Sequence, residues 1–313
     1  GSEHALQLRR QELQLLGRPC GDFDVIDSFV QLVDPAAAEP WTLWYLQAAH
    51  VMLVLGDCLF THGAVRSGGL LLLPAEDCRD GELHRQPPPL RLPDDTPLNE
   101  WAMRLNEWKQ RQLSWFEAFP KWVQFEGGER WRGGQPLMMP SLSGCRVMID
   151  GYLQQGSMAM LDEDVAAYLS RNACRRVFAG HQPHGQCPGV LRHPRSGITV
   201  VVADTSFSDG KADKSANAAD TRGAAVSTVL VTRNSTRVAG VLADGTCHRY
   251  ELQLQGIQDS PLDALVGCRF TDGSWGKTVV GEQLQLCRGE GFVQHLQLVP
   301  LQEAIAQLDD IFK

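Results

Sequence analysis

The sequence lacks long apolar runs and clusters of positive charge. The four leucines Leu70–Leu73 are bounded by glycine and proline, far short of the roughly 20 apolar residues of a membrane-spanning helix. The chain has 29 Lys and Arg against 37 Asp and Glu, a net charge of −8. Its longest basic pairs, Arg9-Arg10 and Arg175-Arg176, are expected on helix surfaces. Nucleic acid and anionic membranes need clustered cations, so we expect neither as a partner.

Paired cysteines are missing as well. The nine cysteines are an odd number, and no two of them have the two-residue gap of a zinc knuckle or redox motif. A chain of 313 residues can bury a sizeable core and needs no disulfides for stability. We therefore expect mostly buried, reduced thiols and a cytoplasmic or other reducing intracellular compartment. The opening Gly1-Ser2 indicates a processed, tagged or truncated chain.

The first half of the chain predicts helices, a hairpin and a loop. Helix-forming residues over 4–16 end at Gly17, a common helix stop. The β-like runs Val51–Leu55 and Cys58–Thr61 flank Gly56-Asp57, which predicts a tight hairpin. The Pro-rich, acidic stretch 68–97 predicts an exposed loop.

A long aromatic helix is predicted between Pro97 and Pro120. Its apolar side chains recur at three- and four-residue steps, as a helix packed on a core requires. Such a stripe could also stack on a ligand, but the packing interpretation is the simpler one. The residues of the stripe are Leu98, Trp101, Leu105, Trp108, Trp115, Phe119 and, just beyond the proline, Trp122.

The second half predicts first alternating and then purely antiparallel structure. A helix over Glu163–Arg175, a strand over Arg176–Phe178 and a strand over Ile198–Val202 are typical of an α/β fold. The apolar period then changes to two, which predicts an antiparallel meander and further strands before a last helix near 301–312. We therefore expect a domain over 1–221 and an antiparallel β extension with a terminal helix over 222–313.

Two histidines follow hydrophobic strands directly. His62 stands after Leu59-Phe60-Thr61 and before Gly63, and His181 follows Val177-Phe178-Ala179-Gly180. A neighbouring glycine lets the backbone bend so that an imidazole points into a site. Two imidazoles from separate strand ends are common ligands of a divalent transition metal. Each histidine could equally be an ordinary core or loop residue.

These segments resemble a known family. Residues 56–65 (Gly-Asp-Cys-Leu-Phe-Thr-His-Gly-Ala-Val) resemble the strand and His-Gly-Gly motif of calcineurin-like metallophosphoesterases, and residues 176–183 resemble their later Gly-His-Thr-Pro motif. Between the two, Trp131-Arg132-Gly133 is similar to the Trp-x-Arg segment of the bacterial-like (Shewanella-type) branch of phosphoprotein phosphatases. Val200–Asp204 is similar to the strand that follows in that branch. The order and spacing agree over roughly residues 50–205.

The resemblance implies a hydrolase of phosphate monoesters with two divalent metal ions, Mn, Fe or Zn. Such ions clamp the phosphate, supply a bridging hydroxide and stabilise the charge of an in-line displacement. By motif position, His62 and His181 would bind one metal of the pair. Arg132 would hold a phosphate oxygen with its planar fork of donors. The implied fold is an α/β sandwich of two sheets flanked by helices, of which this chain would hold the second half.

The family's first metal-binding motifs, Asp-x-His and Gly-Asp-x-x-Asp-Arg-Gly, are absent upstream of residue 50. Gly21-Asp22-Phe23-Asp24 resembles the second only superficially. Gly1-Ser2-Glu3-His4 stands where Gly-Asn-His-Glu would fall, so it is either a degenerate motif, with His4 as the phosphate-protonating acid or Glu3 as a ligand, or a cloning scar. We expect the chain to be N-terminally truncated and nearly inactive by itself, because two imidazoles do not make a two-metal site.

Three other signals point elsewhere. Residues 272–278 suggest a phosphate-binding loop but have Thr271 where that motif needs glycine, so a β-turn is the plainer expectation. Cys187 near His181 and His184 could form a Cys–His nucleophile pair, although an inert thiol is expected. His184 could be a second ligand after His181.

Two functions are weighed against each other. The first is metal-dependent hydrolysis of a phosphoprotein or a small phosphorylated molecule. The second is a non-catalytic module of the same fold that binds a protein partner through the aromatic helix or the C-terminal β region. The missing ligands favour the second, whereas His62, Arg132 and His181 together with their flanking glycines favour the first, which we prefer.

Overall fold

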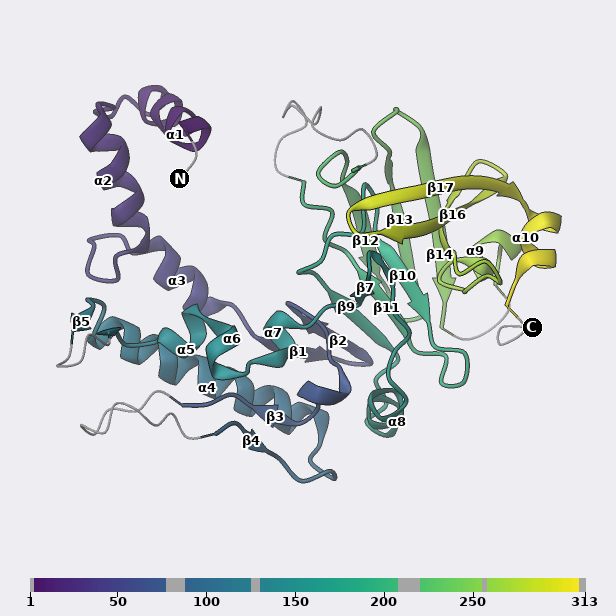
Figure 1. Ribbon diagram of the computed structural model, residues 1–313, viewed down its shortest axis with the longest axis horizontal. Coiled ribbons are helices and arrows are strands. Elements are labelled where there is room, and N and C mark those ends of the chain that lie inside the picture. Colours follow the sequence, from purple (N-terminus) through teal and green to yellow (C-terminus); the bar gives the residue numbers. More distant parts are fainter. Residues whose placement is uncertain (1–2, 77–87, 125–129, 208–219, 255–257, 310–313) are drawn as a thin grey trace. The chain divides into compact units, whose positions relative to one another are not determined.

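The computed structural model describes residues 3–76, 88–124, 130–207, 220–254 and 258–309 (Figure 1). The chain divides into two compact units. The first comprises residues 1–50, 74–90 and 104–144, and the second comprises residues 51–73, 91–103 and 145–313. The fold is mixed α/β with several separate sheets, which confirms the predicted class at this level. No helix in the described part of the chain is both long and apolar enough to cross a membrane.

The first unit is mainly helical. The helix predicted over 4–16 is α1, and two further helices that the sequence pattern did not predict follow it along the chain. Helix α4 begins in the second unit and continues into the first. The elements are α1 (Glu3–Leu15), α2 (Asp22–Val33), α3 (Trp41–Ala48), α4 (Leu98–Ala118), β5 (Val123–Gln124), β6 (Arg130–Trp131), α5 (Gln135–Met138) and α6 (Pro140–Ser143).

Helix α4 confirms the predicted aromatic helix and its packing role. Trp101, Leu105 and Trp108 are completely buried. Trp108 Nε1–H also donates to the Ala75 carbonyl at 3.0 Å, so the one polar group of this indole is satisfied. Trp122, beyond the helix, is about half exposed at 49%. The stripe is therefore core over most of its length, which removes it as a ligand-stacking surface.

Lys109 of α4 is a buried cation that closes the end of α3. Only 3% of its surface is exposed, and burial lowers its pKa. Its ammonium donates to the carbonyl of Leu46 at 2.8 Å and of Gln47 at 3.0 Å, and also to that of Ala49. These carbonyls lie at the C-terminus of a helix, where unpaired acceptors and the negative end of the dipole favour a cation.

We expect Lys109→Met to destabilise the α3–α4 contact by about 2–3 kcal/mol, because three carbonyls lose a charged donor. Hydrogen exchange of the α3 amides, with the global unfolding free energy, measures this effect. Lys121→Met is the matched control, since Lys121 is exposed. Equal protection of the α3 amides from hydrogen exchange in the two variants would show that Lys109 does not stabilise α3.

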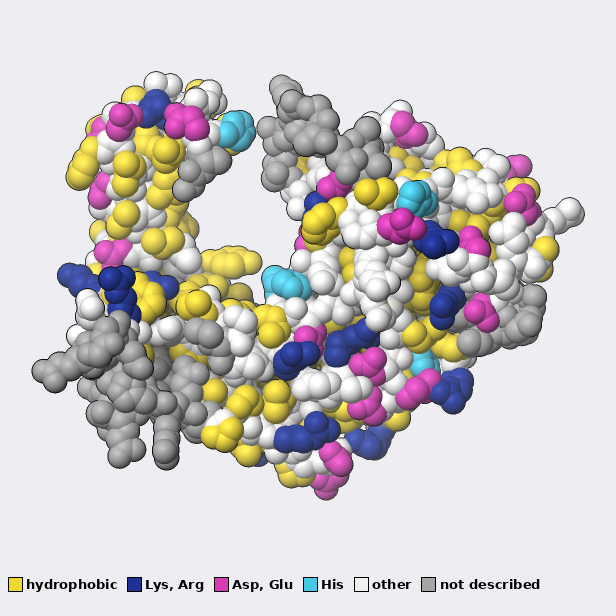
Figure 2. Space-filling view, in the orientation of Figure 1, with side chains coloured by type: hydrophobic (Ala, Val, Ile, Leu, Met, Phe, Trp, Pro, Cys, Tyr) yellow, Lys and Arg dark blue, Asp and Glu magenta, His cyan; other side chains and the backbone are white. Residues whose placement is uncertain are grey.

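Hydrophobic side chains also lie on the surface of the first unit. Phe23 (79% exposed), Ile26, Val30 and Val33 line one side of α2, and Tyr45 of α3 is 73% exposed. Figure 2 shows hydrophobic side chains gathered over these helices. Continuous apolar surface of this kind commonly marks a contact surface.

The second unit is built on a five-stranded sheet with the order β1-β2-β9-β11-β10. Strands β2, β9 and β11 are mutually parallel neighbours, and the outer pairs β1–β2 and β10–β11 are antiparallel. The β1–β2 pair is the predicted hairpin, with Gly56 at φ +61° in its turn. The strands are β1 (Met52–Leu55), β2 (Cys58–Thr61), β9 (Arg176–Ala179), β10 (Gly189–Arg192) and β11 (Thr199–Val202).

Two three-stranded antiparallel sheets complete this unit. They confirm the predicted meander and the later strands, and they share a hydrophobic core with the five-stranded sheet through Phe178, Tyr250 and Phe270. The strands are β12 (Ser227–Val231), β13 (Ser235–Val241), β14 (Cys247–Gln253), β15 (Trp275–Val280), β16 (Gln283–Glu290) and β17 (Val293–Pro300). The smaller elements are the 3₁₀ helix η1 (Ser67–Gly69), β3 (Leu72–Leu73), β4 (Leu90–Arg91), α7 (Arg146–Ile149), β7 (Leu153–Gln154), β8 (Ser157–Met158), α8 (Glu163–Arg171), α9 (Pro261–Leu265) and α10 (Leu301–Gln307).

Arg176 corrects one sequence-based expectation. Arg175-Arg176 was predicted to be a helix-surface pair, but α8 ends at Arg171 and Arg176 is the first residue of β9, only 4% exposed. Its guanidinium donates to Asp57 Oδ1 at 2.5 Å and to the carbonyls of Thr232 and Ser235 at 2.8 and 3.1 Å. A buried arginine therefore joins the five-stranded sheet to the β12–β13 turn.

Candidate functional site

Three chemically active side chains follow the ends of three adjacent parallel strands. His62 comes after β2, His181 after β9 and Asp204 after β11. The strands are in register, with Phe60 opposite Phe178, so their carboxyl ends meet at one edge of the sheet. The outer side of this edge is where ligands bind in open α/β sheets.

The two predicted metal ligands lie together. His62 Nε2 and His181 Nδ1 are 3.2 Å apart, and their ring centroids are 5.1 Å apart. Both side chains are exposed. The Gly180 amide donates to the His62 carbonyl at 2.9 Å, which ties the two strand ends together. This geometry is consistent with the prediction that the two histidines, which follow separate strands, face the same site.

The backbone bend at His181 lies at a different residue from the one predicted. We predicted that a glycine would supply the bend, yet His181 itself has the left-handed φ of +70°. A non-glycine residue in this region is strained, and such strain is frequent at functional sites. Gly63 has another role: a Cβ there would lie 2.5 Å from the Asp150 carbonyl oxygen, so its lack of a side chain permits close packing.

Asp204 is a site residue that the sequence prediction did not include. Its negative charge acts on His62 and raises the pKa of that imidazole, but partial burial and the neighbouring His181 outweigh it and lower the pKa overall. Asp204 Oδ1 also accepts the Ser206 amide at 2.7 Å. Its position directly after the β-branched strand 199–202 was the signal that could have identified it.

Two imidazoles suit one divalent transition metal, and a lowered pKa keeps the His62 nitrogen available as a ligand. In the described part of the chain, however, no three His, Cys, Asp or Glu side chains gather closely enough to hold a metal ion. These residues can therefore offer two ligands of one ion, but they do not complete the dinuclear centre that the resemblance implies.

Arg132 lies in the first unit, in an aromatic setting. Its guanidinium carbon is 4.9 Å from the centre of the Trp122 ring and 5.8 Å from that of Phe116. Its Nε is buried and has no hydrogen-bond partner among the described residues. Cation–π contacts hold such a group in place while leaving its N–H donors for an anion.

His4, the other predicted catalytic residue, is exposed in the first turn of α1. It belongs to the first unit, as Arg132 does, whereas His62 and His181 belong to the second. Its role as an acid therefore stays a prediction.

His184 and Cys187 belong to a buried cluster instead of the strand-end edge. Lys277 contacts His184 Nδ1 at 3.1 Å and also donates to its carbonyl, and Cys287 Sγ lies 3.9 Å from His184 Nε2. Burial raises the pKa of Cys187, which keeps it a thiol. The geometry thus favours the inert thiol over the Cys–His nucleophile pair. The loop before Lys277 is a turn in which Asp272 accepts hydrogen bonds from Ser274. This agrees with the β-turn expected for 272–278 and not with a phosphate-binding loop.

We expect the His184 ring to be neutral in the folded chain, because complete burial, and after it the charge of Lys277, holds its pKa well below the ordinary value of 6.5. The unfolded chain binds this proton below about pH 6.5 and the folded chain does not, so stability falls as the pH decreases through that range. Titration of the histidine ring protons by NMR measures the protonation of His184, and the free energy of unfolding in urea at several pH values below 7 measures the loss of stability. A His184 resonance that titrates near pH 6.5 would contradict the assignment.

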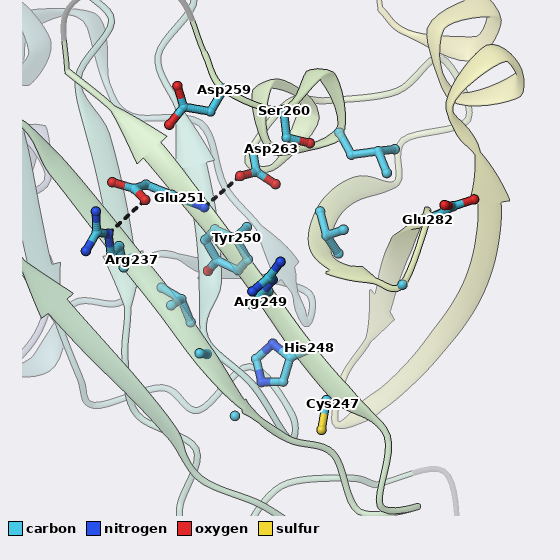
Figure 3. Close-up of a pocket in the computed structure, with 16 residues that line it drawn as sticks. Arg237, Cys247, His248, Arg249, Tyr250, Glu251, Asp259, Ser260, Asp263 and Glu282 are labelled. Carbon is cyan, nitrogen blue, oxygen red and sulfur yellow. Dashed lines mark hydrogen bonds and ion pairs between the residues drawn. The ribbon is translucent and has the colours of Figure 1, made fainter.

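A small cavity opens beside His181. Its volume is about 280 Å³, and it is enclosed by the loops that carry Gln155, Gln182, Arg222 and Phe292. A larger cavity of about 1060 Å³ lies along β13 and β14 (Figure 3). There Arg237 pairs with Glu251, and Asp263 accepts the Glu251 amide. Those groups satisfy one another, and none of the predicted site residues lines that cavity.

Neither a protein-family model, nor a curated protein, nor a solved structure matches this chain.

Proposed function

We propose that this chain contributes to the hydrolysis of phosphate monoesters in a metallophosphoesterase-type α/β sandwich. The observation that supports the proposal is the pair His62 and His181, which follow adjacent parallel strands with ring nitrogens 3.2 Å apart. Exposed imidazoles in such contact can both turn toward a shared ion. The substrate is a phosphoprotein or a small phosphorylated molecule.

A pair of divalent ions would polarise the phosphoryl group and provide a nucleophilic hydroxide at neutral pH. His62 and His181 would hold one ion of the pair. The negative charge of Asp204 acts on His62, as carboxylates commonly do beside metal-binding histidines. The remaining ligands would come from outside the described residues.

Arg132 is proposed to bind a phosphate oxygen. The rings of Trp122 and Phe116 both contact its guanidinium, and its buried Nε has no acceptor in the described part of the chain. No carboxylate among the described residues pairs with Arg132, and its planar fork of donors is well suited to a bidentate contact with phosphate.

The alternative is a non-catalytic module of the same type that binds a protein partner. The incomplete ligand set and the exposed apolar side of α2 favour it. The aromatic helix α4 does not favour the partner-binding alternative, because Trp101 and Trp108 are buried.

Phosphate release from p-nitrophenyl phosphate, by the protein as its gene encodes it, tests the proposal. We expect activity that a chelator abolishes and that Mn²⁺ or Zn²⁺ restores, while residues 1–313 alone remain nearly inactive. The 5′ end of the transcript tests the same point, since an in-frame Asp-x-His and Gly-Asp-x-x-Asp-Arg-Gly upstream would supply the missing ligands. A folded protein that releases no phosphate with any of these ions would make the partner-binding role the better explanation.

A further inference from the structure

The cavity beside His181 has a specific chemical character. Three loops and the β16–β17 turn enclose it, all within the second unit. Its packing depends on glycines: a Cβ on Gly185 would lie 2.0 Å from Gln294 Oε1, and one on Gly156 would lie 2.3 Å from the Gly291 carbonyl oxygen. The cavity walls are therefore closely fitted. Because His181 is part of them, any group bound there lies beside the candidate metal ligand.

Arg222 provides an oriented donor on one wall. Its Nε and Nη2 bind Asp220 at 2.6–3.2 Å, and its guanidinium carbon lies 3.7 Å from the centre of the Phe292 ring. The carboxylate neutralises its charge, and Nη1 has no hydrogen-bond partner among the described residues. A fixed donor without net charge favours an uncharged acceptor such as a hydroxyl or a carbonyl.

The side-chain amides of Gln182 and Gln294 add further hydrogen-bond donors to the lining of the cavity. Gln182 Oε1 accepts the Leu153 amide at 3.1 Å, and Gln294 Oε1 accepts the Thr221 hydroxyl at 3.5 Å. The oxygens are thus oriented toward protein, which leaves the NH₂ groups as donors. Phe292 is still 67% exposed despite its contact with Arg222, so apolar ring surface borders these donors.

We propose that this cavity binds the sugar ring of a monosaccharide phosphate. This inference rests on the proposed function, since it assigns the group that carries the scissile phosphate. A sugar ring has an apolar C–H face and a belt of hydroxyls. Phe292 matches that face, and Arg222, Gln182 and Gln294 match the hydroxyls. The phosphate would then lie at the edge occupied by His181.

The size and charge of the cavity favour a sugar over a phosphopeptide. A volume of about 280 Å³ lies at the lower limit for small-molecule sites and accommodates a single ring. Among the described residues that line it, Arg222 is the one charged side chain apart from His181, and Asp220 already neutralises Arg222. A peptide would find neither a deep apolar pocket nor an unpaired charge for its flanking side chains.

Two measurements test the assignment. The first compares kcat/KM for glucose 6-phosphate, a phosphoserine peptide and p-nitrophenyl phosphate in the metal-loaded protein. We expect the sugar phosphate to exceed the peptide by at least about tenfold. The second detects glucose 6-phosphate on the metal-free protein by saturation-transfer NMR, with the strongest signal on the ring protons. This second readout does not depend on turnover.

Phe292→Ala is the informative variant. It should weaken glucose 6-phosphate binding, and raise the KM for this substrate, by about tenfold, a larger change than in kcat/KM for p-nitrophenyl phosphate. Phe23→Ala is the matched control, because Phe23 is also an exposed phenylalanine but lies on α2. Arg222→Lys should act in the same direction as Phe292→Ala, since lysine cannot keep the two-point contact with Asp220.

The outcomes separate the two proposals. Hydrolysis of p-nitrophenyl phosphate without ring contacts or sugar preference would overturn the sugar assignment and leave the phosphatase proposal intact. A preference for the phosphoserine peptide would also overturn it. Ring contacts that Phe292→Ala removes, in a protein that hydrolyses none of the three substrates, would support the sugar site and reject the phosphatase proposal.

Discussion

Replacing His181 with alanine should lower the rate of metal-dependent phosphate release by at least about 100-fold, because the variant loses one of the two imidazoles that face each other at the strand-end edge. The loss should appear in kcat more than in KM, since an ion that is not held in place fails to stabilise the transition state. The measurement is steady-state phosphate release with Mn²⁺ in excess, on the protein as its gene encodes it.

His295→Ala is the control for this prediction. His295 is an exposed histidine on β17, with 59% of its side chain accessible, and its loss should leave the rate within twofold of the parent. Folding should be nearly unaffected in both variants, because His181 is exposed and alanine has to adopt the same left-handed backbone that histidine adopts there. Unchanged turnover in His181→Ala would remove this residue from the site.

The largest expected loss of stability follows Arg176→Met. The substitution deletes a buried guanidinium that binds Asp57 and the carbonyls of Thr232 and Ser235. Breaking a buried pair typically costs about 3–5 kcal/mol, since the remaining partner keeps its desolvation penalty. The free energy of unfolding in urea measures it.

The adjacent Arg175→Met supplies the comparison, because Arg175 is exposed and its replacement should change stability by less than about 0.5 kcal/mol. The double variant Asp57→Asn/Arg176→Met should lose less than the sum of the two single losses, as expected for side chains in contact. Additive losses, or equal effects at 175 and 176, would show that the buried pair does not stabilise the fold.

Local pattern was sufficient for helices α1 and α4, the β1–β2 hairpin and the longer antiparallel strands. Helix α4 was predicted from the spacing of its aromatic residues, and the β1–β2 hairpin from two apolar runs around Gly56-Asp57. The β12–β14 meander followed from a period of two. These elements are encoded locally because side-chain periodicity and turn residues act within a few positions of each other.

The predictions that failed needed contacts between remote segments. Arg176 has the composition of a surface residue, and only the partners Asp57, Thr232 and Ser235 make its burial tolerable. Helices α2 and α3 were not predicted. The His4 and Arg132 assignments stay predictions, as does the boundary expected at residue 221.

The sequence by itself determined that His62 and His181 stand at the ends of hydrophobic strands, because a strand and the residues after it can be read from a short window. Only the tertiary structure decided that β2, β9 and β11 lie side by side. That pairing brings the two imidazoles into contact, adds Asp204 and forms the cavity lined by Arg222 and Phe292. The physical reason is that strand order depends on which apolar faces pack together across more than 100 residues of intervening chain, and no local pattern specifies that choice.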